Sequence, residues 1–247
     1  MNEKLTAEEI EKLRQEILKE VNVKPPTIGV IGVSGVGKST TLNSLFKTNL
    51  ATSDTVACTK EFRSEPLKLE FQQGYAKNEK VSLVVIDAPG LGEDIFKDPE
   101  YLEMYKENLV ECDVILWIMT GRNRAIALDQ IYLKQLADFH PKIVFGINQV
   151  ELIEPLLWNE RINLPMEQQL KNIEIIQADR KEKIEKIIKT DIKLCSYSAK
   201  KKYNLEELFG LIIDNCPLNR KWVFDGLKNF HYTDFLPEEI RKQFLNK

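Results

Sequence analysis

The chain has 247 residues, of which 43% are hydrophobic and 30% are charged, and its formal net charge at pH 7 is −3. This length fits one α/β domain with short appendages, because domains commonly reach about 250 residues. The slightly negative charge gives no strong nucleic-acid signal, since neutralising phosphates requires a basic field. The four cysteines form no Cys-x-x-Cys pair, which favours buried free thiols in a reducing compartment over metal or disulfide sites.

The N-terminal sequence lacks the basic-then-apolar pattern of a secretory signal, and no apolar run approaches the roughly 18 residues of a membrane span. We therefore expect a cytoplasmic protein without a transmembrane segment. Residues 1–24 predict an amphipathic helix, ended by Pro25 and Pro26, that lies outside the main domain. Its apolar positions near helical spacing are Leu5, Ile10, Leu13, Ile17 and Val21.

A glycine-rich segment, Gly-Val-Ser-Gly-Val-Gly-Lys-Ser at 32–39, lies between an apolar run at 27–31 and an apolar-periodic run at 40–46. This order predicts a strand, a phosphate-binding loop and a helix, although a turn that binds nothing is the alternative. Backbone N–H groups would point inward, the lysine would reach the β- and γ-phosphates, and the last serine could bind Mg²⁺. The expected nucleotide-binding residues here are Gly32, Ser34, Gly35, Val36, Gly37, Lys38, Ser39 and Thr40.

A second buried strand, predicted at 81–86, ends in Asp87-Ala88-Pro89-Gly90. Open α/β sheets present ligands at the carboxyl ends of their strands, so Asp87 could hold Mg²⁺ through a water while the Gly90 N–H meets the γ-phosphate. Other strands are predicted at about 65–71, 113–119, 142–147 and 191–197, and helices at about 38–47, 99–110, 125–139, 166–189 and 204–214. Residues 68–83 resemble an antiparallel hairpin.

Two polar segments follow later predicted strands: Asn148-Gln149-Val150-Glu151 and Ser198-Ala199-Lys200. They resemble the Asn-Lys-x-Asp element and the fifth motif of GTPases. With the phosphate loop and Asp-Ala-Pro-Gly, they make the stretch from about Thr27 to Cys216 similar to the translation-factor class of P-loop GTPases. Era-like bacterial GTPases are the most similar group, because the chain has Asp-Ala-Pro-Gly-Leu-Gly and a switch-like segment at 55–61.

The resemblance implies a P-loop NTPase three-layer α/β sandwich at 25–216, with a mostly parallel six-stranded sheet and one antiparallel strand. It implies GTP/GDP and Mg²⁺ as ligands. The Asn148 side chain would meet the base edge, and the Glu151 carboxylate would accept from the guanine N1–H and N2–H₂ groups. Gln149 replaces the family's lysine, which predicts weaker binding. The N–H groups of Ser198, Ala199 and Lys200 would contact the guanine O6.

The same resemblance implies a threonine that binds Mg²⁺ and senses the γ-phosphate, which we assign to Thr59, with Thr55 and Thr52 as alternatives. The expected catalytic residues are Lys38, Thr59 and Gly90, and the expected metal ligands are Ser39, Thr59 and Asp87.

Two departures from the family concern catalysis. Leu91 stands where Ras-type enzymes have a water-orienting glutamine, and Gly35 stands where potassium-activated relatives have an asparagine. We therefore expect slow intrinsic hydrolysis. Arg122 and Arg124 are interpreted either as surface charges or as contacts for a second protomer.

Two segments carry no recognised motif. The insertion at 152–190 contains a charged, amphipathic stretch that is either an ordinary packing helix or a partner-binding helix. Residues 217–247 form a C-terminal appendage whose many aromatic residues predict packing on the G domain or on the N-terminal helix.

The sequence favours a slow GTPase that acts as a nucleotide-dependent molecular switch, with an unknown effector. The alternative is a nucleotide-gated assembly module of the septin-like or immunity-related type, with a possible homodimer across the nucleotide face. A third interpretation, an ATP-binding P-loop protein, would be decided by nucleotide competition.

Overall fold

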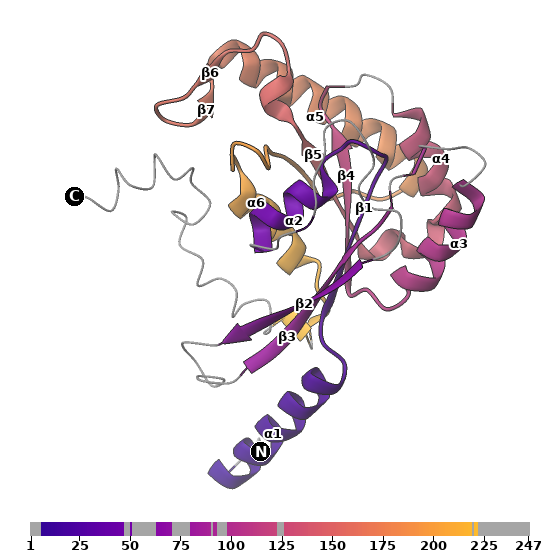
Figure 1. Cartoon of the computed structure of the whole chain (residues 1–247), viewed down its shortest axis with the longest axis vertical. Helices are drawn as coiled ribbons and strands as arrows, with labels where there is room; N and C mark the ends of the chain where they lie inside the picture. The colour runs from indigo at the N-terminus through magenta and orange to yellow at the C-terminus, as the bar shows by residue number, and fades with distance from the viewer. Residues whose placement is uncertain are drawn as a thin grey trace.

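The computed structural model describes residues 6–46, 50, 63–70, 80–89, 91–92, 98–122, 126–218 and 220–221, and it is built around a six-stranded sheet (Figure 1). The strand order is β2-β3-β1-β4-β5-β8. The strands are β1 (Thr27–Ile31), β2 (Arg63–Glu70), β3 (Lys80–Asp87), β4 (Val114–Thr120), β5 (Ile143–Asn148) and β8 (Leu194–Ser196). The pair β2–β3 is antiparallel and the other pairings are parallel, which confirms the mixed sheet that the sequence predicts.

Helices cover both faces of the sheet, so the three-layer α/β fold is confirmed. Two helices, α2 (Lys38–Phe46) and α6 (Leu205–Asp214), pack on one face, and their apolar residues share one core cluster with β1 and β4. Residues of α3 (Asp98–Leu109), α4 (Ala127–Gln135) and α5 (Glu167–Ile188) share the second cluster. β1 and β5 are buried along their whole length, and β4 is buried up to Met119. Their continuous apolar runs are therefore what a sheet covered on both faces requires.

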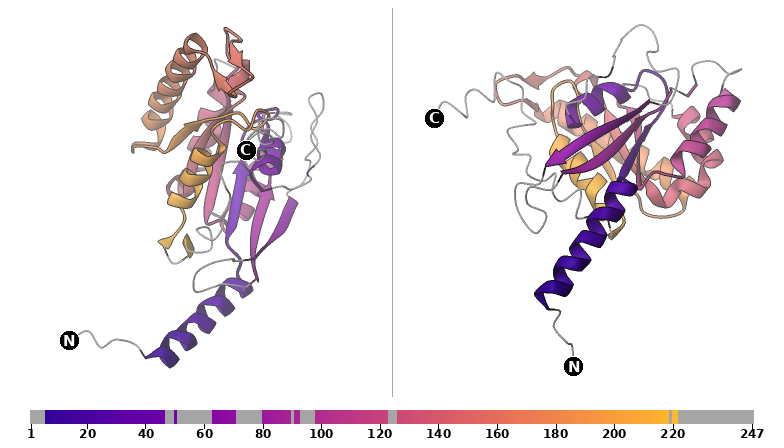
Figure 2. Two further views of the ribbon diagram at one scale, coloured as in Figure 1. Left: turned by 90° about the vertical axis from the view of Figure 1, so that its left-hand side faces the viewer. Right: turned by 60° about the horizontal axis from the view of Figure 1, so that its bottom comes forward.

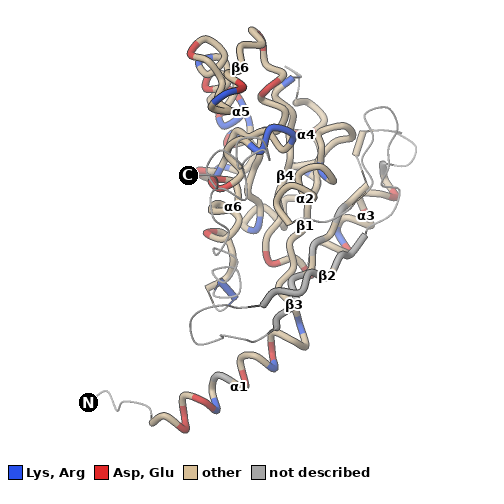
Figure 3. The backbone as a smooth tube through the Cα atoms, turned by 60° about the vertical axis from the view of Figure 1, so that its left-hand side comes forward, with Lys and Arg blue, Asp and Glu red and all other residues tan. Residues whose placement is uncertain are grey.

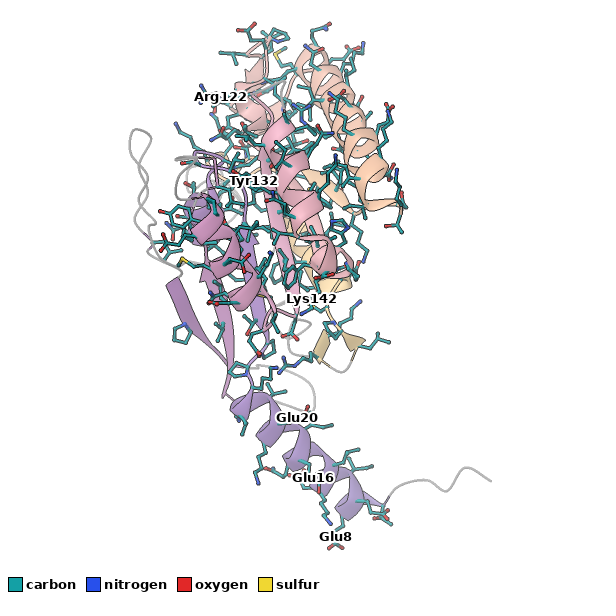
Figure 4. All side chains as sticks on the ribbon, turned by 90° about the vertical axis from the view of Figure 1, so that its right-hand side faces the viewer. Glu8, Glu16, Glu20, Arg122, Tyr132 and Lys142 are labelled. Atoms are coloured by element: carbon teal, nitrogen blue, oxygen red, sulfur yellow. The ribbon has the colours of Figure 1, made fainter. Side chains whose placement is uncertain are left out.

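The parallel strands place their carboxyl ends at one edge of the sheet. A 3₁₀ helix, η1 (Ala137–Lys142), leads into β5 at the opposite edge, and another, η2 (Val150–Leu152), follows the carboxyl end of β5. Figure 4 shows Arg122, which follows β4, and Lys142, which precedes β5, at opposite ends of these two neighbouring strands. The segments that follow β1, β3, β5 and β8 therefore lie at the edge where α/β proteins bind ligands.

The N-terminal helix, α1 (Ala7–Val23), begins at a capping box in which Thr6 and Glu9 bond each other's backbone N–H. It extends away from the sheet in both views of Figure 2. Leu18 and Val21, near its end, are buried, whereas Ile10, Leu13 and Ile17 are exposed. Acidic and basic residues are interspersed along it (Figure 3), with Glu8, Glu16 and Glu20 labelled in Figure 4.

A buried ion pair joins both terminal regions to the amino edge of the sheet. The Asp113 carboxylate accepts from Arg220 Nη1 at 2.8 and 2.9 Å and from the Thr27 N–H at 2.8 Å. Arg220 Nη2 also donates to the Lys24 carbonyl. The chain thus returns, after α6, to the base of α1.

The structure adds an element that the sequence did not predict. A short hairpin, β6 (Trp158–Asn159) and β7 (Leu164–Pro165), lies inside the insertion before α5. Strands of two residues are too short to show a two-residue alternation of apolar and polar positions. The helix predicted at 125–139 instead ends at Gln135 and gives way to η1, which contains Pro141, a residue without a backbone N–H for an α-helix.

Three of the four cysteines, Cys112, Cys195 and Cys216, are buried free thiols, as expected, while Cys58 lies outside the described residues. Burial is the main cause that raises the pKa of Cys112, to about 12, which makes it a packing residue rather than a nucleophile. In the described part of the chain, no helix has the length and apolar character needed to cross a membrane.

Candidate nucleotide-binding site

The glycine-rich loop between β1 and α2 wraps in a conformation that depends on its glycines. Gly32, Gly35 and Gly37 have φ values of 147°, 78° and 88°, which residues with a Cβ rarely adopt. A Cβ on Gly32 would lie 2.3 Å from the Ile118 carbonyl oxygen, so the loop also needs glycine for close contact with β4. Because α2 begins at Lys38, the first N–H groups of this helix lie at the loop and give it a partial positive charge.

Lys38 lies within the loop. Its Nζ donates to the carbonyls of Gly32 and Val33 at 3.2 Å each, and only 7% of the residue is exposed. An ammonium group held there adds a full positive charge to that of the helix end. The positive charge of the loop thus favours the binding of an anion such as a polyphosphate.

The segment after β3 lies against this loop. Val30 of β1 and Asp87 of β3 are in register, and Tyr105 donates from its hydroxyl to the Pro89 carbonyl. The Leu91 carbonyl then accepts the Ser34 N–H at 3.0 Å. The side chain of Asp87 and the whole of Thr59 and Gly90 lie outside the described residues.

Leu91 is fully buried in the core cluster of the α3 and α4 face. Its N–H also points to the Gly32 carbonyl at 3.4 Å. The side chain that stands in the glutamine position therefore faces the protein core and offers nothing that could orient a water.

Asn148, at the end of β5, joins three parts of the site. Its Nδ2 donates to the Val36 carbonyl at 2.9 Å, and its Oδ1 accepts the Ala199 N–H at 3.0 Å. Only 3% of the residue is exposed. The amide thus holds the phosphate loop and the Ser-Ala-Lys segment at a fixed separation.

Gln149 adds a second bond to the phosphate loop. Its Nε2 donates to the Gly35 carbonyl at 3.0 Å, while its Oε1 accepts from the Thr120 hydroxyl at 2.8 Å. The residue has a left-handed backbone, with φ at 64°, which turns the chain from β5 into η2. A neutral amide therefore bridges β4 and the phosphate loop at the position where the Asn-Lys-x-Asp element has a lysine.

Glu151, in η2, carries a carboxylate oxygen without a partner. The residue is 9% exposed, and no donor among the described residues lies within hydrogen-bonding distance of its Oε2. The neighbouring Tyr197 is fully buried, with its hydroxyl 2.8 Å from Thr41 Oγ1. Burial raises the pKa of Tyr197, and the Glu151 charge adds to this effect.

The segment after β8 is a tight turn. Ser198 and Tyr203 exchange two backbone hydrogen bonds at 3.0 and 3.1 Å, and Ser198 Oγ accepts the Lys201 N–H at 2.9 Å. The Ala199 carbonyl accepts from Ser44 of α2 at 3.0 Å. Lys200 is exposed. The small residues Ser198 and Ala199 are thus buried, with Ala199 bonded to Asn148 and to α2, while Lys200 is exposed to solvent.

Comparison with known proteins agrees with this geometry. Residues 27–149 match the family model described as 50S ribosome-binding GTPase. The uncharacterized protein YkfA of Escherichia coli K12 is 34% identical over 148 residues, which make up 59% of this chain and 48% of YkfA. The GTPase Der of Buchnera aphidicola is 29% identical over 129 residues, covering 51% of this chain and 26% of Der. The chain thus spans about half the length of YkfA and about a quarter of the length of Der.

The crystal structure of Aquifex aeolicus Era superposes with a TM-score of 0.54 and 23% identity, covering 77% of this chain and 56% of Era. At this identity the likeness concerns the fold. The chain carries an Era-like P-loop GTPase domain.

The GTPase domain brings together most of the residues that the sequence singled out. The phosphate loop, the segment at 148–151 and the segment at 198–200 lie at one edge and contact each other through Asn148 and Gln149. Sequence reasoning missed three residues that hold these segments: Thr41, Thr120 and Gln169. Their residue types carry no motif, since each acts through a partner far away in the sequence.

Proposed function

We propose that the GTPase domain binds GTP and GDP together with Mg²⁺, hydrolyses GTP slowly, and acts in the cytoplasm as a nucleotide-dependent switch. The observation that carries the guanine preference is the unpaired, buried carboxylate oxygen of Glu151. A buried acceptor without a donor costs about 1–3 kcal/mol. Guanine offers two adjacent donors, N1–H and N2–H₂, whereas adenine has no N–H at N1, so a guanine base would relieve this cost.

The phosphate side supports the same proposal. Lys38 and the N–H groups of the loop would hold the β- and γ-phosphates. Ser39 is the second residue of α2, and Asp87 ends β3 in register with Val30 of the adjacent strand β1. Oxygen ligands of the kind that Mg²⁺ prefers would therefore come from adjacent segments. When bound, Mg²⁺ would neutralise charge on the phosphates. Thr59 and Gly90 are proposed to sense the γ-phosphate.

The proposed slow rate rests on Leu91. Its buried side chain cannot orient a water, and its backbone is bonded to the phosphate loop. We expect the isolated protein to hydrolyse GTP in the slow intrinsic range of about 10⁻⁴ to 10⁻² s⁻¹ that GTPases show without a partner. A single-turnover rate of several per second, measured on dilute monomer, would contradict this assignment.

Two variants test nucleotide binding itself. Lys38→Ala removes the loop's ammonium, so affinity for labelled GTP should collapse while the circular dichroism spectrum is kept. Glu151→Gln replaces one acceptor oxygen by a donor, and it should weaken GTP binding at least about tenfold, about 1.4 kcal/mol. Wild-type GTP affinity in Lys38→Ala would refute the phosphate site, and an unchanged preference for GTP over ATP in Glu151→Gln would refute the base site.

One observation favours the alternative, an assembly module in which nucleotide binding controls homodimer formation. The region after the base-reading segment exposes several large apolar side chains: Leu156, Leu157, Ile162, Leu164 and Met166. Exposed Arg122 follows β4 at the same edge (Figure 4), where it could contact a second protomer. If this function holds, the GTPase rate per molecule rises with protein concentration. A constant rate over a hundredfold range favours the monomeric switch.

We also propose that the chain divides into an N-terminal helix at 1–24, the G domain at 25–216 and a C-terminal appendage at 217–247 that packs on the G domain. The ion pair between Arg220 and Asp113 supports this division, because it anchors the beginning of the appendage to the residue that precedes β4. Trp222 and the later aromatic residues of the appendage lie outside the described residues. The effector of the switch would be identified by nucleotide-dependent elution of bound proteins.

A further inference from the structure

The insertion helix α5 contacts the base-reading segment through one side chain. Gln169, in the first turn of α5, is 0% exposed. Its Nε2 donates to the Ile153 carbonyl at 2.9 Å and lies 3.2 Å from the Glu151 carbonyl and 3.4 Å from the Val150 carbonyl. One amide group therefore gathers the carbonyls of the short turn that carries Glu151.

Few other bonds between described residues hold this turn. Within it, the Leu152 N–H donates to the Gln149 carbonyl at 3.0 Å and the Ile153 N–H to the Val150 carbonyl at 3.1 Å. Its bond to the residue that follows β8, from the Val150 N–H to the Tyr197 carbonyl, is long, at 3.5 Å. Without Gln169, the buried carbonyls of Glu151 and Ile153 would lose a donor, and buried carbonyls are almost always paired. The turn would then shift toward water or other donors.

The position of Gln169 is itself fixed by its surroundings. One helical turn later, Ile173 is buried in the core. Asn172 Nδ2 donates to the Glu154 carbonyl at 2.6 Å, and the Met166 N–H donates to the Leu157 carbonyl at 2.7 Å. The helix start thus packs as a rigid support against the segment that follows η2.

We infer that Gln169 is a positioning residue for guanine specificity: it fixes the turn so that the Glu151 carboxylate meets the guanine N1–H and N2–H₂ donors. This inference rests on the proposed base-reading role of Glu151. The phosphate loop and the Ala199 N–H are also held by Asn148, which precedes this turn at the end of β5. Loss of Gln169 should therefore weaken the contact with the 2-amino group more than the contacts with the phosphates.

Inosine nucleotides isolate this contact, since hypoxanthine keeps the N1–H and O6 of guanine and lacks the 2-amino group. The experiment compares the affinities for GTP and ITP, by displacement of a fluorescent GDP analogue, in wild type, Gln169→Leu and Gln168→Leu. Leucine has a similar volume to glutamine and no donor. Gln168 is the adjacent, exposed glutamine of the same helix turn, so its variant is the matched control.

We expect Gln169→Leu to lower the ratio of GTP to ITP affinity at least fivefold, while Gln168→Leu changes neither affinity. ITP affinity should also fall in Gln169→Leu, but less than GTP affinity, because hypoxanthine keeps the N1–H contact with Glu151 and lacks the 2-amino contact. In Glu151→Gln the ratio should already be lost, and adding Gln169→Leu should lower it no further, as residues acting through one contact are not additive. If Gln169→Leu does not fold, Gln169→Met, which is unbranched and also lacks a donor, takes its place.

An unchanged ratio in a folded Gln169 variant, or a proportional loss of GTP and ITP affinity, overturns the inference and leaves the proposed function intact. Equal affinity of the wild type for GTP and ITP instead overturns the base-reading role of Glu151, and the inference with it. If Gln169→Leu lowers the ratio of GTP to ITP affinity in the Glu151→Gln background as much as it does in the wild type, Gln169 acts independently of Glu151. That result also overturns the inference.

Discussion

Replacing Asn148 by alanine should destabilise the whole nucleotide edge, because this amide connects three chain segments. The variant removes the donor to the Val36 carbonyl and the acceptor for the Ala199 N–H. Val36 and Ala199 are themselves buried, so neither group gains water easily. Each buried polar group left unpaired costs about 1–3 kcal/mol. For the two groups together the expected loss is about 2–6 kcal/mol, a large part of the roughly 5–15 kcal/mol that stabilises a typical domain.

Urea denaturation at pH 7 measures this loss, and titration with labelled GDP measures the accompanying loss of affinity. Asn148→Asp keeps an acceptor for the Ala199 N–H and places a carboxylate against the Val36 carbonyl, so it should be at least as damaging as alanine. Asn172→Ala is the control, since it removes one bond to the Glu154 carbonyl at an exposed position and should cost below about 1 kcal/mol. If Asn148→Ala unfolds within 1 kcal/mol of wild type, the proposed joining role is wrong.

Two further predictions concern backbone and pH. Gly35 and Gly37 have similar positive φ values, and a Cβ on Gly35 meets nothing within 4 Å while one on Gly37 meets Asn148 Nδ2 at 2.5 Å. Gly35→Ala should thus cost about 1–2 kcal/mol of strain, and Gly37→Ala should cost clearly more by urea denaturation; equal losses would contradict the contact. Burial raises the pKa of Asp129 to about 6, although the Trp117 N–H and the charge of Arg180 lower it. The folded state therefore binds the Asp129 proton more tightly than the unfolded chain does. The resulting contribution to the free energy of unfolding is fully present below pH about 4 and is lost as pH rises through about 6. It amounts to about 3 kcal/mol at most. Asp129→Asn should flatten this part of the stability–pH curve, and an unaltered slope between pH 4 and 7 would refute it.

The sequence by itself determined the local parts of the fold. Eight consecutive residues specify the phosphate loop, and continuous apolar runs specify β1, β4 and β5, because periodicity and glycine content act over a few neighbours. The placement of the base-reading segments at the same edge also followed from the sequence, since parallel strands share the direction of their carboxyl ends. The hairpin at 158–165 could not be predicted, because two-residue strands have no pattern of their own.

Only the tertiary structure decided what holds the site together. Asn148 bonds to residues 112 positions before it and 51 positions after it in the chain, and Gln169 reaches back 16 to 19 positions from a helix that the sequence marks only as amphipathic. The sequence likewise shows leucine at position 91 in place of the glutamine of Ras-type enzymes. The burial of Leu91, however, follows from the way β3 pairs with β1. The physical reason is that a side-chain amide can bond any backbone group that the fold brings near it. Its partner is therefore set by the crossovers and the packing of distant elements, which no local pattern records.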